Sequence, residues 1–193
     1  MYQTLGVVLA GGLSSRMKKD KATLQRKHES MLDFSQSILK KCGVDKVVIS
    51  GNNYQIKDSF KHLGPLSGIL SVIEQCPTHS LLIMPIDLPL IEPSTLKQLK
   101  IIGELSQKAC CYQDHPLPLY LPVNGFVEVF LRQQLHGVKA KGPSMKHLLA
   151  NIPHKILATP DQQKLFNCNT PNDWRHAQDL LVKEKPATKT NVS

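Results

Sequence analysis

The first ten residues constrain the fold most strongly, because an apolar run there ends at two glycines. Residues 4–10 read TLGVVLA, and Gly11 and Gly12 follow. An uninterrupted apolar run of this kind is typical of a strand that is buried on both faces. Such strands occur mostly in parallel sheets whose two faces are covered by helices. The pattern therefore favours an α/β fold.

Strand-like and helix-like segments alternate along the rest of the chain. Further strands are predicted at residues 46–50, 80–86, 108–112, 117–121 and 155–159. Helices are predicted at residues 30–41, 65–75, 93–105, 125–134, 144–149 and 171–182. The polar and basic residues 13–29 are expected to be a loop. This order predicts a three-layer α/β/α, Rossmann-like fold with a mostly parallel sheet.

The composition predicts one soluble domain in a reducing compartment. The chain has 193 residues, 41 % of them hydrophobic, and we expect residues 1–182 to form a single domain with a flexible polar tail at 183–193. No apolar run reaches the roughly 18 residues that span a membrane, and no signal peptide is recognisable. The five cysteines lack CxxC spacing, which argues against a zinc site or disulfides. A cytoplasmic location is the expectation.

The charge of the chain indicates an anionic partner. The formal net charge is +9 and the pI is near 9.4. Such a surface attracts either nucleic acid or a small anionic substrate such as a triphosphate. The basic residues are not interleaved with the aromatic side chains on which single-stranded nucleic acids stack. A small anionic substrate is therefore favoured, and nucleic acid is not the expected partner.

The glycine pair after the first strand is the first candidate for a ligand site. Glycines let the backbone approach a ligand closely, and successive N–H groups can bind an anion. Arg16 and Lys21 would add positive charge beside phosphates. The alternative is a plain surface turn with a solvated basic loop. The segment is neither GxGxxG nor a P-loop, so it is not one of the common dinucleotide or P-loop fingerprints.

Two further segments have the chemistry of a nucleotide site. Asp87 follows the predicted strand 80–86 between two prolines, where a carboxylate can hold Mg²⁺ or merely cap a turn. The stretch 64–68, GPLSG, starts a helix that can pass close to a base or ribose, or simply pack tightly. Ligands of open parallel sheets bind beyond the carboxyl ends of the strands. Gly11-Gly12, Gly51-Asn52 and Asp87 are therefore expected to meet in one crevice.

Taken together, these segments resemble the molybdenum cofactor guanylyltransferase family of MobA-like nucleotidyltransferases. The family's LAGGxSxRMGxDK loop matches residues 9–21 at every fixed position except Lys18. Its GPLxG helix start, its PxDxP aspartate segment and its NxNTP element match residues 64–68, 85–89 and 167–171. A second departure is the short segment 54–63, since the family has a longer one with a nucleotide-binding aspartate. Asp58 cannot be assigned that role from the sequence.

The resemblance implies an activity and a set of site residues. The reaction would transfer GMP from GTP to a molybdopterin-type cofactor with Mg²⁺ and release pyrophosphate. The implied catalytic residues are Arg16, Lys21 and Asp87, and Asp87 would hold the metal. The implied nucleotide-binding residues are Leu9, Ala10, Gly11, Gly12, Lys21, Asn52 and Asp87. The residues implied to face the acceptor are Asn124, Lys146 and Asn169.

Alternatives and partners follow from the same resemblance. A relative that uses another base or acceptor, such as a cytidylyltransferase, is the nearest alternative. A catalytically weak nucleotide-binding protein is the second, because of Lys18 and the short 54–63 segment. The expected state is a monomer or weak oligomer that receives its acceptor from cofactor-delivery proteins.

Overall fold

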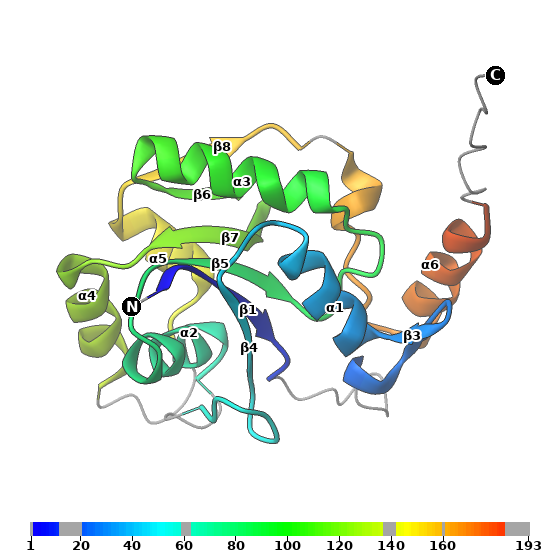
Figure 1. Cartoon of the computed structure of the whole chain (residues 1–193), viewed down its shortest axis with the longest axis horizontal. Coiled ribbons are helices and arrows are strands. Elements are labelled where there is room, and N and C mark those ends of the chain that lie inside the picture. Colours follow the sequence, from blue (N-terminus) through cyan, green and yellow to red (C-terminus); the bar gives the residue numbers. More distant parts are fainter. Residues whose placement is uncertain (1, 12–20, 59–62, 137–141, 160, 184–193) are drawn as a thin grey trace.

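One six-stranded sheet, in the order β4-β1-β5-β7-β6-β8, organises the fold (Figure 1). The structure is a computed structural model, and it describes residues 2–11, 21–58, 63–136, 142–159 and 161–183. The strands are β1 Tyr2–Leu9, β4 Lys46–Ser50, β5 Thr78–Pro85, β6 Ala109–Tyr112, β7 His115–Pro122 and β8 His154–Leu157. β7 runs antiparallel to β5 and β6, and the other pairs are parallel. The predicted α/β fold with a mostly parallel sheet is confirmed.

The helices also lie where the sequence predicted them. They are α1 Met31–Lys40, α2 Pro65–Gln75, α3 Pro93–Ser106, α4 Gly125–Leu135, α5 Met145–Asn151 and α6 Pro171–Lys183. The ends of all the predicted strands and helices differ from the observed ones by at most two residues. Because α6 includes Lys183, the predicted tail begins inside the helix, and its remaining residues 184–193 lie outside the described ranges. None of the helices in those ranges is long and apolar enough to cross a membrane.

The expected loop at 13–29 is wrong for the part that the structure describes. Residues Lys21–Thr23 form the 3₁₀ turn η1, and a small hairpin pairs β2 Gln25–Arg26 with β3 Glu29–Ser30. Strands of two residues are too short to give a readable alternation of apolar and polar side chains. Burial of Ala22, which is 3 % exposed, anchors the turn in the core.

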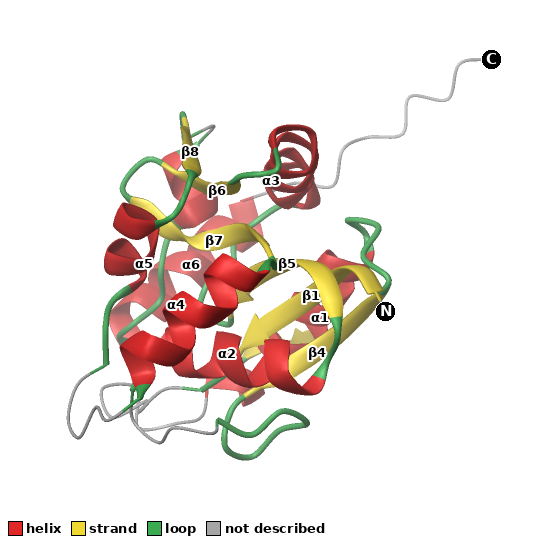
Figure 2. Ribbon diagram, turned by 90° about the vertical axis from the view of Figure 1, so that its left-hand side faces the viewer, coloured by secondary structure: helices red, strands yellow, loops and turns green. Residues whose placement is uncertain are grey.

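Two apolar cores hold helices on the two faces of the sheet. Side chains of α2, α4 and α5 pack on one face, and side chains of α1 and α3 pack on the other. Figure 2 shows α2, α4 and α5 together on one side. The predicted inward face of α1 (Met31, Ser35, Ile38 and Leu39) and that of α2 (Leu66, Ile69, Leu70 and Ile73) are both buried. In sheets of this kind, ligands bind beyond the carboxyl ends of the parallel strands.

Candidate functional site

The carboxyl ends of the neighbouring strands β4, β1 and β5 meet at one edge of the sheet. In register, Leu9 at the end of β1 lies beside Ser50 of β4 and Pro85 of β5. The Ala10 N–H donates to the Ser50 carbonyl oxygen at 2.9 Å, and the Ile86 N–H donates to the Leu9 oxygen at 3.2 Å. The segments that carry Gly11, Asn52 and Asp87 therefore converge, as the sequence predicted.

Lys21 joins two of the predicted site segments. Its Nζ atom lies 3.2 Å from Asp87 Oδ2 and 2.9 Å from Asn169 Oδ1. The side chains of Lys21 and Asp87 are only 16 % and 19 % exposed. Partial burial weakens solvent screening, so this ion pair is stronger than one on an open surface. An ammonium, a carboxylate and an amide from distant parts of the chain thus form one cluster.

The segment before α6 is fixed beside this cluster. The Cys168 N–H donates to the Asp87 carbonyl oxygen at 2.9 Å, and Asp173 Oδ2 accepts the N–H groups of Asn169 and Thr170. These N–H groups, that of Asn169 first, lower the pKa of Asp173. Burial, and secondarily the neighbouring carboxylates, raise the pKa of the Cys168 thiol to about 12. This thiol stays protonated at neutral pH and is not a nucleophile.

The second oxygen of Asp87 fits a metal ion. Oδ1 is buried and has no hydrogen-bond partner among the described residues. A buried carboxylate oxygen without a partner is costly, so a cation there would satisfy it. The described residues contain no group of three or more His, Cys, Asp or Glu side chains suited to a metal. Mg²⁺ commonly takes one or two protein carboxylates and completes its shell with water and phosphate oxygens, so a single aspartate fits it.

Asp58 is the site residue that sequence reasoning did not place. Its Oδ1 accepts the Ser50 hydroxyl at 3.2 Å. A Cβ atom added to Gly11 would lie 3.2 Å from Asp58 Oδ2, and one added to Gly68 would lie 2.6 Å from Ser50 Oγ. The carboxylate therefore sits where the glycine loop, β4 and the start of α2 meet. The only sequence signal for this placement was that Asp58 precedes GPLSG by a few residues. That signal does not predict that the Asp58 side chain lies against Ser50 and Gly11.

Gly11 contributes close packing rather than a free donor. The sequence led us to expect its N–H to face phosphates, but that N–H donates to the Ser50 carbonyl oxygen at 3.1 Å. A Cβ at Gly11 would press on the Asp58 carboxylate and touch Gly51 Cα at 3.4 Å, an ordinary contact distance. A side chain here would therefore require a small shift of Asp58.

The remaining predicted residues are placed differently. The Leu9 side chain is 7 % exposed, which leaves only its backbone for a ligand, and Ala10 is half-buried. Asn52 is exposed in the turn after β4. Arg16 and Gly12 lie outside the described residues.

The three residues expected to face the acceptor are not brought together. Asn169 belongs to the Lys21 cluster, whereas the Asn124 side chain accepts the Val127 N–H and caps α4. Lys146 lines a separate cavity of about 360 Å³ between α5, β6 and β8. Its wall is mainly apolar, from Leu149, Pro116 and others, with Asp114, His115 and His154 around it.

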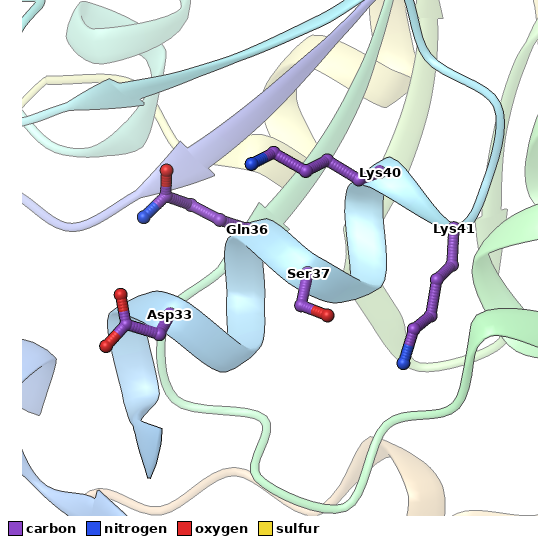
Figure 3. Close-up of a pocket in the computed structure, with 5 residues that line it drawn as sticks. All are labelled: Asp33, Gln36, Ser37, Lys40 and Lys41. Carbon is purple, nitrogen blue, oxygen red and sulfur yellow. The ribbon is translucent and has the colours of Figure 1, made fainter.

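Another hollow, of about 610 Å³, runs along the solvent side of α1 (Figure 3). It is lined by Asp33, Gln36, Ser37, Lys40 and Lys41, which all come from this helix or its end. Figure 3 shows Gln36 and Lys40 extending from neighbouring turns. A single polar helix face does not enclose a ligand, and none of these lining residues belongs to the Lys21–Asp87–Asn169 cluster.

The protonation of Asp58 gives a test of its environment. Burial raises the pKa of the Asp58 carboxyl, and the Ser50 hydroxyl lowers it only in part. Because the pKa of Asp58 is higher in the folded than in the unfolded chain, the protonated carboxyl stabilises the folded protein at a pH below the unfolded-state pKa. This stabilisation is lost as the pH rises through the folded-state pKa. At pH 7 the ionised carboxylate therefore costs stability. Asp58→Asn should raise the Tm at pH 7, and the gain should vanish as the pH is lowered toward 4.

Thermal denaturation followed by circular dichroism across that pH range checks this expectation. Asp179→Asn, at an exposed position of α6, is the control and should leave the Tm unchanged. An equal Tm difference between Asp58→Asn and the parent protein at every pH would contradict the assignment.

Comparison with known proteins agrees with this geometry. The MobA-like NTP transferase domain family matches residues 6–154. A molybdenum cofactor guanylyltransferase of Xanthomonas euvesicatoria is 34 % identical over 94 % of this chain and 95 % of its own length. A probable molybdenum cofactor guanylyltransferase of a Nostoc species is 26 % identical, covering 90 % and 89 %.

A solved structure supports the fold independently. The molybdopterin-guanine dinucleotide biosynthesis protein A of Archaeoglobus fulgidus superposes with a TM-score of 0.73 at 19 % identity, covering 93 % of this chain and 99 % of that one. At 19 % identity the structural similarity shows the fold alone. The family is shown by the matches to the family model and to the sequence relatives. The chain belongs to the molybdenum cofactor guanylyltransferase family of MobA-like NTP transferases.

Proposed function

We propose that this protein transfers GMP from GTP to a molybdopterin-type cofactor, releases pyrophosphate, and uses Mg²⁺ held at Asp87. In the reaction, a phosphate oxygen of the acceptor bonds to the α-phosphorus while the bond to pyrophosphate breaks. The observation that carries the proposal is the Lys21–Asp87–Asn169 cluster at the carboxyl edge of the sheet. The names of the sequence relatives supply the substrates.

Lys21 is suited to bind the phosphates. An ammonium has three N–H donors, and among the described residues Asp87 and Asn169 accept two of them. The remaining donor can point to a phosphate oxygen without the loss of either contact. Its positive charge would offset the charge that develops on the leaving pyrophosphate.

Asp87 is suited to the metal through Oδ1. Oδ2 accepts from Lys21, and the unpartnered Oδ1 is left for the cation. When bound, Mg²⁺ would neutralise phosphate charge and orient the phosphate oxygens. The Cys168 N–H on the backbone oxygen of Asp87 fixes the loop, so that the carboxylate keeps its direction.

The nucleoside would lie on the β4 side of β1, whereas Asp87 lies on the β5 side. Asn52 is exposed there and can both donate to and accept from a base. Asp58 Oδ2 faces Gly11 and can accept hydrogen bonds from the nucleoside. The contributions of Arg16 and Gly12, the cytoplasmic location, the monomeric or weakly oligomeric state and the delivery proteins stay predictions from the sequence.

Calorimetric titration tests the proposal directly. GTP, CTP and ATP are each titrated with Mg²⁺ and again with a chelator, and pyrophosphate release is then followed after molybdopterin is added. We expect GTP to bind most tightly, only with Mg²⁺, and pyrophosphate to appear only with both substrates. Tighter CTP binding would favour the cytidylyl alternative, and GTP binding without pyrophosphate release would favour a nucleotide-binding protein.

Lys21→Ala should weaken Mg²⁺–GTP binding by about ten- to a hundredfold, since a hydrogen bond to a charged group contributes about 1.5–3 kcal/mol. Calorimetry at two salt concentrations measures the change, and the variant should show the weaker salt dependence because one phosphate-facing charge is gone. Lys40→Ala, which removes an exposed ammonium from α1, is the matched control. An unchanged Kd for Lys21→Ala would rule out this role.

A further inference from the structure

Arg26 connects the segment that carries Lys21 to the loop that carries Asp87. We propose that Arg26 is a positioning residue, which acts on the reaction by holding the Lys21 ammonium at the Asp87 carboxylate. This inference rests on the proposed function for its kinetic consequence. The contact between the two segments rests on the geometry alone.

The first contact reaches the Asp87 loop itself. Arg26 Nε donates to the carbonyl oxygen of Pro89 at 2.6 Å, two residues beyond Asp87. The Arg26 side chain is only 12 % exposed, so this charged hydrogen bond is largely shielded from water. Shielding strengthens a hydrogen bond and makes its loss costly. Arg26 is therefore a fixed link to the loop and not a solvated surface cation.

The second contact fixes the plane of the guanidinium. Its central carbon lies 3.7 Å from the centroid of the Phe34 ring, which belongs to α1 and is 5 % exposed. Glu29, its cross-strand neighbour in the hairpin, lies 3.7 Å from a terminal nitrogen. Stacking and a directed Nε–H bond at the same time require a planar group, which lysine lacks.

The chain between Lys21 and Arg26 is short and held in place. The Leu24 N–H donates to the Lys21 carbonyl oxygen at 3.3 Å, and Ala22 is buried. One segment therefore contacts the Asp87 loop twice, through Lys21 at residue 87 and through Arg26 at residue 89. The other side of the loop is held by Leu90, which packs with Cys168 and α6. Figure 1 shows the hairpin on the same side of the molecule as α1 and α6.

Loss of the Arg26 link would remove one polar contact between the two segments, which also share the Lys21 contact and the apolar core around Ala22 and Leu88. A displacement of about 1 Å at a reacting centre can cost about a hundredfold in rate, so a partial displacement should cost about ten- to thirtyfold. If Arg26 acts through Lys21, this loss should disappear once the Lys21 ammonium has been removed. A purely structural residue would lower the Tm and leave the rate of the folded enzyme unchanged.

A double-mutant cycle tests the inference. Arg26→Met and Arg26→Lys are measured alone and combined with Lys21→Ala, with kcat from pyrophosphate release at saturating GTP and molybdopterin. Both single variants should lose about ten- to thirtyfold in kcat, and neither should lower kcat further in the Lys21→Ala background. Losses that multiply in that background, or an unchanged kcat in Arg26→Met, would overturn the proposal. Arg132→Met, which breaks an exposed pair with Glu74 on the far helices, is the control and should keep the parent kcat.

Hydrogen exchange separates this inference from the proposed function. In Arg26→Met, amide exchange should become faster in both 21–26 and 87–91, while 125–135 of α4 stays unchanged. Faster exchange in 21–26 alone would overturn the link, whether or not the protein turns over GTP. Should Arg26→Met fail to fold, Phe34→Leu removes the stacking contact together with part of the core packing of that ring, and it should give the same exchange pattern at smaller amplitude. Absence of turnover in the parent protein would count against the proposed function only.

Discussion

Replacement of Asp87 by asparagine is expected to lower kcat about a thousandfold, which corresponds to roughly 4 kcal/mol of lost transition-state stabilisation. Asparagine has nearly the same shape, and its one side-chain oxygen can take the place of Asp87 Oδ2 and accept the Lys21 hydrogen bond. It lacks the negative charge that would hold a divalent cation, so the substitution should weaken binding of the proposed Mg²⁺ and keep the loop. Pyrophosphate release at saturating GTP, measured across a Mg²⁺ titration, checks the expectation.

The Mg²⁺ titration also shows the mechanism of the loss. The variant should require far more Mg²⁺ for its residual activity, while its Tm stays near that of the parent protein. Asp179→Asn, the same change at an exposed position of α6, is the control and should leave both quantities unchanged. Full activity of Asp87→Asn at the parent's Mg²⁺ requirement would show that the metal is bound elsewhere.

Replacement of Gly103 by alanine should be the most destabilising of the small changes. Gly103 is buried in α3, and a Cβ there would lie 2.0 Å from Tyr120 Cδ1 and 2.5 Å from Cγ. The Tyr120 ring is 3 % exposed and cannot move aside easily. Overpacking of a core costs about 1–3 kcal/mol or more, and at this overlap we expect about 3 kcal/mol. For a chain of this length that corresponds to a Tm lowered by roughly 6–12 °C.

A matched glycine and a compensating change make this prediction specific. A Cβ at Gly125, in the first turn of α4, would meet no atom within 4 Å, so Gly125→Ala should keep or slightly raise the Tm. Tyr120→Leu should recover part of the loss in the Gly103→Ala background by making room for the methyl group. Thermal denaturation of the parent protein, Gly103→Ala, Gly125→Ala and the double variant Gly103→Ala/Tyr120→Leu measures both effects. A Tm unchanged by Gly103→Ala would mean that α3 does not rest on Tyr120.

The pattern of apolar residues and the positions of glycine and proline were sufficient to predict the main helices and strands. β4 (Lys46–Ser50) and α2 (Pro65–Gln75) have the predicted bounds, because a buried apolar run and a proline at a helix start report local structure directly. The meeting of Gly11, Asn52 and Asp87 could also be predicted, since parallel strands bring their carboxyl ends to one edge. The family loop supplied Lys21 and the NxNTP motif supplied Asn169.

Other features depended on contacts that no local pattern encodes. Asn124 looked like a ligand residue but caps α4, and Asp58 looked unassignable but lies against Gly11 and Ser50. Arg26, in a segment expected to be a loop, contacts Pro89 across 63 residues. Lys21 and Asn169 are 148 positions apart in the sequence, yet Lys21 Nζ lies 2.9 Å from Asn169 Oδ1.

The sequence by itself therefore determined the main elements, their order along the chain and the edge of the sheet at which the predicted site segments meet. These follow from the local alternation of apolar and polar residues and from the chirality of strand connections. Only the tertiary structure decided which polar side chains share the site. Their directions depend on how the turn at Lys21, the loop at Asp87 and the segment before α6 pack together. That packing is a property of the folded chain, since hydrogen bonds between distant loops leave no periodic trace in the sequence.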